Sequence, residues 1–343
     1  MVRLPHFLRI ILPLLFAALL VSGLFAGSGI SLAELIATLK GVSPAATCAI
    51  LACTLLFLAL STLKWRLVMG HMGVNDRAAP SWNFSLYYTS LGAVLSLVIT
   101  PHAAMLVSRS VGAKLHLKGS AIANAAGSAY EQFFDVIPVA TMSLAAIISI
   151  VLNASLAGWL AISAALNIAA FLAITLVFKT PFWLLTRFVP LPQRRRAVLA
   201  EKMEWFATPN AKTLLGVPFV ATLFAISLVR YAILLLRTGL VMASIDMPIS
   251  AFQYVKAYGI ARLSSIVSIT PGELGVTEWT WSGVLTWMGF GLDEAARFAL
   301  ANLIYNYASL LVVFGFAWLA FSLLLAFRPT DPAPAVIHGQ KQL

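Results

Sequence analysis

Acidic residues occur inside stretches of this sequence that are apolar enough to cross a lipid bilayer. Glu131 and Asp135 are four residues apart, so on a helix they share one face. On a helix starting near Gly119 they would lie roughly 18–24 Å along the axis, close to mid-bilayer. Acids at that depth normally face a bundle interior, where they are paired or hydrated. We predict that both contact a polar ligand; the alternative is that they pair with intramembrane arginines and fix the helix packing.

A second acidic pair flanks a helix break that reads Thr-Pro-Gly-Glu-Leu-Gly-Val-Thr-Glu over residues 270–278. Glycine allows the backbone to turn closely, and a half-helix beginning after Gly275 would direct its positive end at a cavity. We predict that Glu273 and Glu278 belong to the same ligand site. In the alternative interpretation, Glu278 caps its own helix and Glu273 reaches the outer membrane interface.

Arginines at membrane depth supply the opposite charge. The planar guanidinium donates parallel hydrogen bonds that suit a phosphate group. Each could instead form an internal salt bridge or extend to the interface. We predict headgroup contacts from Arg109, Arg230 and Arg262.

The composition requires a membrane protein. Charged residues make up 10% of the 343 positions, whereas soluble domains carry about 25%. The apolar runs are continuous and lack the short alternating strands of a membrane barrel, so the spans are helices. A net charge of +11 placed in loops orients spans rather than binding nucleic acid. Cys48 and Cys53 lie within one apolar run, so we expect neither a metal nor a cofactor.

The basic loops predict the topology, because loops rich in Lys and Arg stay cytoplasmic. We assign one such loop to Lys64, Arg66 and Arg77, and the other to residues 179–213. Keeping both inside requires 83–118 to dip in and return, turning near Pro101, and 249–290 to dip from the other side, turning near Pro271. Both chain ends are then cytoplasmic, and the crossing segments are 10–27, 42–63, 119–151, 156–178, 213–243 and 293–327.

We therefore predict an all-α, polytopic helical bundle of about six spans with two broken re-entrant helix pairs. Residues 1–343 form a single transmembrane domain, with repeat-like halves at 83–178 and 213–327 and a disordered tail at 328–343. Such opposed breaks are typical of inverted-repeat transporters, whose broken helices meet near the midplane. Proline frees backbone groups that cannot face lipid, so the breaks indicate a buried or hydrated site. The predicted break residues are Pro101, Pro271, Gly272 and Gly275.

Three strings of the sequence resemble the lysylphosphatidylglycerol synthase transmembrane region, a family of flippase-like membrane proteins. They are residues 270–278, Pro101 with Arg109 eight residues later, and Glu131-Gln132-Phe133-Phe134-Asp135. The resemblance implies a lipid-translocating fold with re-entrant helices and no catalytic residues. The family's first break usually reads Pro-Gly-Arg-x-Gly-Glu, and this chain departs from it at His102 and the residues that follow. Gln132 and Asn306 stand where that family carries arginine.

The sequence thus predicts a flippase-like transporter of the cytoplasmic membrane that moves a polar, phosphate-bearing lipid headgroup. No Gly-Lys-Ser/Thr nucleotide motif occurs, and we expect Glu131 or Asp135 to carry any coupled proton and Glu131→Gln to abolish translocation. One alternative is a membrane-embedded enzyme of lipid-linked glycan or phospholipid synthesis. Another is an accessory subunit of an envelope-synthesis complex. The lipid, the transport direction and the oligomeric state are left open.

Overall fold

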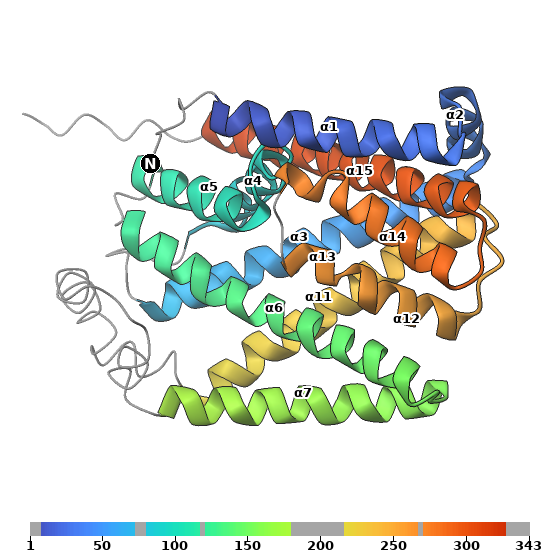
Figure 1. Ribbon diagram of the computed structural model, residues 1–343. Coiled ribbons are helices and arrows are strands. Elements are labelled where there is room, and N and C mark those ends of the chain that lie inside the picture. Colours follow the sequence, from blue (N-terminus) through green and yellow to red (C-terminus); the bar gives the residue numbers. More distant parts are fainter. Residues whose placement is uncertain (1–7, 73–79, 117–120, 180–215, 267–269, 327–343) are drawn as a thin grey trace, which may run out of the picture.

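The computed structural model describes residues 8–72, 80–116, 121–179, 216–266 and 270–326. Every regular element within these ranges is helical, which confirms the predicted all-α class (Figure 1). Their bounds are α1 Leu8–Ser28, α2 Leu32–Gly41, α3 Pro44–Met72, α4 Trp82–Leu95, α5 Pro101–His116, α6 Ala121–Val151, α7 Leu156–Lys179, α11 Val217–Ser244, α12 Ala251–Ala261, α13 Leu263–Ile266, the 3₁₀ turn η2 Pro271–Glu273, α14 Val276–Trp287 and α15 Leu292–Ala326.

The long helices have the length and apolar composition of membrane spans. Five of them qualify individually, namely α3, α6, α7, α11 and α15, and the bent pair α1 and α2 raises the number to six. A span needs about 20 residues, and α3 and α6 contain 29 and 31. The chain is therefore a multi-pass membrane protein, and its described residues contain five or six candidate spans, in line with the roughly six predicted.

Two segments are too short to cross and are broken as the prolines predict. The chain between α4 and α5 turns at residues 96–100, and Pro101 is the first residue of α5. Proline is favoured at that position because its missing N–H would have no helical partner there. In the second segment η2 begins at Pro271, and Gly272 and Gly275 have φ values of +62° and +80°. Such angles favour glycine.

The two breaks meet inside the molecule. In Figure 1, α5 lies in the left half of the bundle, α12 and α14 lie in the right half, and α13 lies between them. A Cβ added at Gly272 would be 3.3 Å from both the Cα of Leu97 and the carbonyl oxygen of Ser96, which belong to the first turn. This close approach brings together the ends of two segments that are separated by about half the chain.

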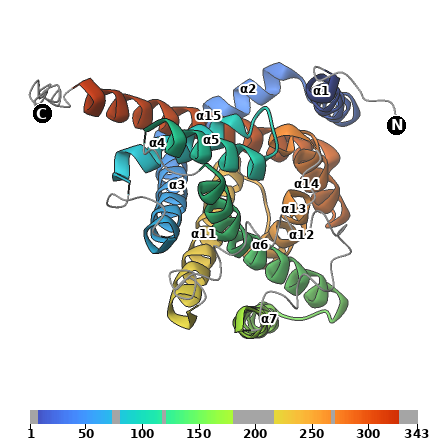
Figure 2. The same cartoon turned by 90° about the vertical axis from the view of Figure 1, so that its left-hand side faces the viewer.

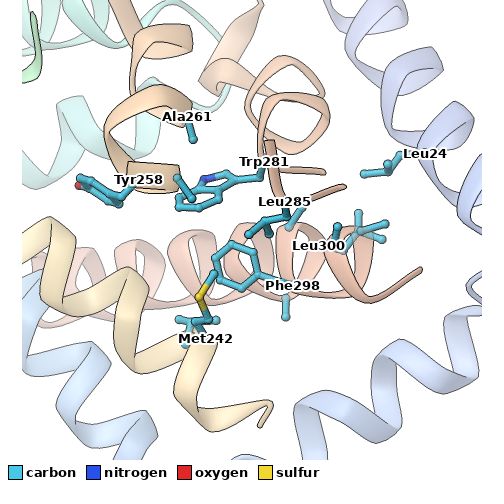
Figure 3. Close-up of a cluster of buried hydrophobic side chains, with 14 of the residues drawn as sticks. Leu24, Met242, Tyr258, Ala261, Trp281, Leu285, Phe298 and Leu300 are labelled. Atoms are coloured by element: carbon cyan, nitrogen blue, oxygen red, sulfur yellow. The ribbon is translucent and has the colours of Figure 1, made fainter. Parts of the chain in front are cut away.

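An apolar cluster holds the second broken segment in place. Side chains of α1, α11, α12, α14 and α15 interlock in it, as Figure 3 shows for Leu24, Met242, Tyr258, Trp281 and Phe298. The ring centroids of Trp281 and Phe298 are 4.9 Å apart in an edge-to-face arrangement, which suits the aromatic quadrupoles. The re-entrant helix α14 is therefore fixed by its neighbours rather than by its own length.

The outer surface is apolar because its solvent is lipid. Helix α7, at the bottom edge of the view in Figure 2, leaves Leu160, Ile168, Leu172 and Leu176 more than half exposed. The bundle interior buries polar and charged side chains of the inner helices beside aromatic and aliphatic ones. Large apolar side chains exposed along a whole helix are unusual in a soluble protein and agree with the membrane class.

The loop assigned from the sequence to Lys64, Arg66 and Arg77 was placed wrongly. Lys64 and Arg66 lie within α3, the Lys64 side chain is 0% exposed, and Arg77 lies outside the described residues. The apolar run ends at its first charged residue, yet the helix continues to Met72 because that lysine is paired inside the bundle. The basic loop 179–213, apart from Lys179, and the tail 328–343 lie outside the described residues.

Candidate functional site

Glu131 forms an ion pair with Arg109 of α5. Both side chains are almost completely buried, at 1% and 0% exposed. Arg109 also donates to the hydroxyls of Ser61 and Thr89, at 3.1 and 3.2 Å, and lies over the Trp65 ring. These contacts join α3, α4, α5 and α6. Glu131 therefore pairs with an intramembrane arginine and holds helices together, which was the alternative to a ligand contact.

Asp135, one turn further along α6, is held by two cations. Its Oδ1 accepts a hydrogen bond from Lys64 Nζ at 2.6 Å, and its Oδ2 is paired with Arg230 of α11. The Ser227 hydroxyl donates to Oδ1 at 2.8 Å. Because buried charges need such compensation, this cluster ties α3, α6 and α11 together. It leaves the site one positive charge in excess.

At the second break the two glutamates have different positions. Glu278 is 3% exposed and accepts a hydrogen bond from the backbone N–H of Gly275, so it caps the start of α14, as the alternative interpretation proposed. Glu273 instead faces a cavity, and the Thr277 hydroxyl donates to it at 3.4 Å. Glu273 forms no ion pair with any described residue.

A cavity of about 230 Å³ lies where the two breaks meet. Its wall contains both turns and residues of the long helices α6, α11 and α15. The predicted site residues that line it are Pro101, Glu131, Asp135, Arg230, Arg262, Gly272 and Glu273. A smaller adjoining cavity of about 50 Å³ reaches Glu278. Pro271, Gly275 and Arg109 line neither cavity, and Arg109 is occupied by its ion pair.

Two arginines face the cavity without an acidic partner among the described residues. Arg262, the C-cap of α12, was predicted from the sequence, whereas Arg237 of α11 was not. Arg237 is 8% exposed and lines both cavities, as do Arg262 and Glu273. These two guanidinium groups and the single carboxylate of Glu273 together carry one excess positive charge. This charge favours binding of an anion in the cavity.

A polar pair, His102 of α5 and Gln132 of α6, lies at the first break. His102 Nδ1 lies 2.7 Å from the side-chain oxygen Oε1 of Gln132, and both residues line the cavity. Asn306 and Tyr307 of α15 complete the polar wall, and the Tyr307 hydroxyl donates to the Gly272 carbonyl at 3.2 Å.

Sequence reasoning missed part of this site for identifiable reasons. It noted His102, Gln132 and Asn306 as departures from a family pattern, yet these residues line the cavity. It left Lys64 out because it assigned that residue to a cytoplasmic loop, and it placed Arg237 at membrane depth without including it in the site. An ionisable residue within an apolar helix indicates a functional or pairing site, so membrane depth was the usable signal.

The described residues form a polytopic helical membrane bundle in which two broken segments meet at a charged cavity. The family model for the lysylphosphatidylglycerol synthase TM region matches residues 10–315. The chain therefore belongs to that family, which confirms the resemblance. No curated protein and no solved structure gives a significant match.

Proposed function

We propose that this protein moves a phosphate-bearing lipid headgroup across the cytoplasmic membrane, with both chain ends on the cytoplasmic side. The observation that carries the proposal is the pair Arg237 and Arg262, which face a cavity inside a membrane bundle without ion-pair partners in the described chain. Guanidinium groups bind phosphate through parallel, charge-assisted hydrogen bonds.

The size of the cavity supports a headgroup rather than a whole lipid. Its volume of about 230 Å³ is below the roughly 300–1,000 Å³ of pockets that enclose drug-sized ligands. The acyl chains would stay in the surrounding lipid, where the outer faces of the helices are apolar. Family membership gives independent support, because the family contains lipid-related membrane domains.

The energetics permit transport without a nucleotide. An anionic headgroup moved outward gains about 2.3 kcal/mol per charge for each 100 mV of an inside-negative potential. Glu131 and Asp135 are engaged by cations, so they are less suited to carry a coupled proton than the sequence suggested.

The test uses purified protein in vesicles that contain fluorescent phospholipids, with a membrane-impermeant quencher reporting movement between leaflets. We expect Arg237→Gln and Arg262→Gln each to slow phosphate-lipid movement at least about tenfold, because each removes a charge-assisted hydrogen bond. Arg297→Gln is the matched control, because the Arg297 side chain is 41% exposed and its ion pair with Asp293, at 3.8 Å, lies between two largely exposed side chains.

Movement no faster than in protein-free vesicles would contradict the proposal, and so would unchanged rates in both cavity variants. Chemical conversion of the lipid would instead support the membrane-enzyme alternative.

A further inference from the structure

We propose, building on the function above, that the transported headgroup is a phosphate ester bearing hydroxyl groups and no amine, such as a glycerol- or sugar-phosphate lipid. The phosphate would occupy the end of the cavity at Arg237 and Arg262. The hydroxyl groups would meet His102 and Gln132 at the other end. The second half of this assignment is new, and it rests on the geometry of the first break.

His102 and Gln132 form a hydrogen-bonded pair. The partner of His102 Nδ1 is the side-chain oxygen Oε1 of Gln132, at 2.7 Å, so the imidazole donates in the tautomer that carries its proton on Nδ1. When the ring is neutral, its other nitrogen, Nε2, is then an acceptor. Gln132 is 9% exposed, and its amide nitrogen Nε2 is buried without a hydrogen-bond partner in the structure.

These two free groups match a hydroxyl. The cavity wall offers an acceptor on His102 and a donor on Gln132, and a hydroxyl group can donate and accept at once. A buried donor without a partner costs free energy, so a ligand hydroxyl that pairs with the Gln132 amide is favoured. An ammonium group carries only donors and leaves that amide unsatisfied.

Carboxylates that might attract an amine are already engaged at this end. Glu131 is paired with Arg109, and Asp135 with Lys64 and Arg230. An amine would have to compete with cations of the chain itself. The carboxylate without an ion pair, Glu273, lines both cavities together with Arg237 and Arg262, whereas His102 and Gln132 line only the larger one. Glu273 therefore belongs to the arginine end.

The experiment compares three fluorescent lipids in the same vesicles: phosphatidylglycerol, phosphatidylethanolamine and phosphatidic acid. We expect the wild-type protein to move phosphatidylglycerol fastest. Gln132→Glu places a carboxylate beside His102 and should raise the ethanolamine-to-glycerol rate ratio roughly tenfold, because a charge-assisted contact replaces a neutral one. His102→Phe, at an exposed position with little risk to folding, should reduce the phosphatidylglycerol rate to that of phosphatidic acid.

Gln253→Glu is the matched control. Gln253 occupies the third position of the α12 capping box, where glutamate serves equally well, and it does not line either cavity. The same change of charge there should leave the ratio unchanged.

The outcomes separate the two proposals. If no lipid moves, the transport function fails. If lipids move but the wild type prefers the amine, or if neither cavity variant changes the ratio, the hydroxyl-selective site fails while transport stands. Uptake of radiolabelled glycerol 3-phosphate in place of lipid movement would show that the ligand is a free phosphate ester, which also overturns the assignment.

Discussion

The pair of Glu131 and Arg109 shows why a buried acid is not by itself a ligand contact. Glu131 is 1% exposed at the cavity wall, and its partner Arg109, which does not line the cavity, has three further hydrogen-bond contacts with α3 and α4. Removing one partner of a buried ion pair leaves the other charge uncompensated. The prediction that Glu131→Gln abolishes translocation without loss of protein stays a prediction, and the buried ion pair adds an effect on stability to it.

We expect Glu131→Gln to destabilise the protein by about 3–5 kcal/mol, because it leaves Arg109 buried without its carboxylate. Thermal unfolding of the purified protein in detergent, followed by tryptophan fluorescence and size-exclusion profile, measures the effect. Glu34→Gln is the control, because Glu34 is exposed in the α2 capping box, where glutamine is an accepted substitute. Equal unfolding temperatures for the two variants would refute a structural role of the pair.

At the scale of elements, the second re-entrant segment depends on how closely α1 approaches it. Gly275 has φ +80°, and a Cβ there would lie 2.4 Å from the Leu20 Cβ and 3.2 Å from the Ala17 carbonyl oxygen. The Trp279 indole N–H donates to the Leu20 carbonyl at 2.7 Å. Helix α1 thus clamps the start of α14, and the clamp works only with glycine at residue 275.

We expect Gly275→Ala to destabilise the fold by roughly 2 kcal/mol or more, since a positive φ strains alanine and the added methyl group collides with α1. Lipid movement should fall as well, because α14 carries one wall of the smaller cavity. Gly283→Ala in the same helix is the control: it has open space around its Cβ position, and alanine is the better helix former there. The measurement is the thermal unfolding temperature of each variant. A Gly275→Ala protein that unfolds at the wild-type temperature would exclude the clamp.

At the scale of the whole molecule, the first broken segment determines the topology. If 83–118 returns to the side from which it enters, the end of α5 lies on the cytoplasmic side, whereas Lys40 at the end of α2 lies outside. In Figure 1 the start of α1 and the end of α15 lie at one end of the bundle, and α2 lies at the other. The start of α1 and the end of α15 thus share one side of the bundle, and the cytoplasmic location of that side stays a prediction.

The orientation can be tested with single cysteines in spheroplasts of an expression host, after Cys48→Ala and Cys53→Ala remove the native thiols. We expect an impermeant maleimide to label Lys40→Cys in intact spheroplasts and Lys114→Cys only after permeabilisation. Both lysines are exposed at helix ends. The fold itself therefore leaves both positions open to the maleimide, and a difference in labelling reports the side of the membrane. Labelling of Lys114→Cys from outside would mean that the segment crosses the membrane.

The sequence by itself determined the membrane class, the number of spans and the positions of both breaks. These follow from local physics: apolar length decides whether a helix can cross, and proline and glycine decide where the backbone can turn. Part of the cavity wall could be predicted for the same reason, since Arg230, Arg262, Asp135 and Glu273 stand at membrane depth in helices or beside breaks that the sequence pattern reveals.

Only the tertiary structure decided which of these charged residues form ion pairs with other residues of the chain. Arg109 and Glu131 neutralise each other, Lys64 joins Asp135 inside the bundle, and Arg237 and Arg262 remain facing the cavity. Pairing depends on contacts between helices that are far apart in the chain, such as α3 with α6 and α11, and no local pattern records them. The same distance in sequence hid the meeting of His102 with Gln132, because their contact forms only when the first break folds against α6.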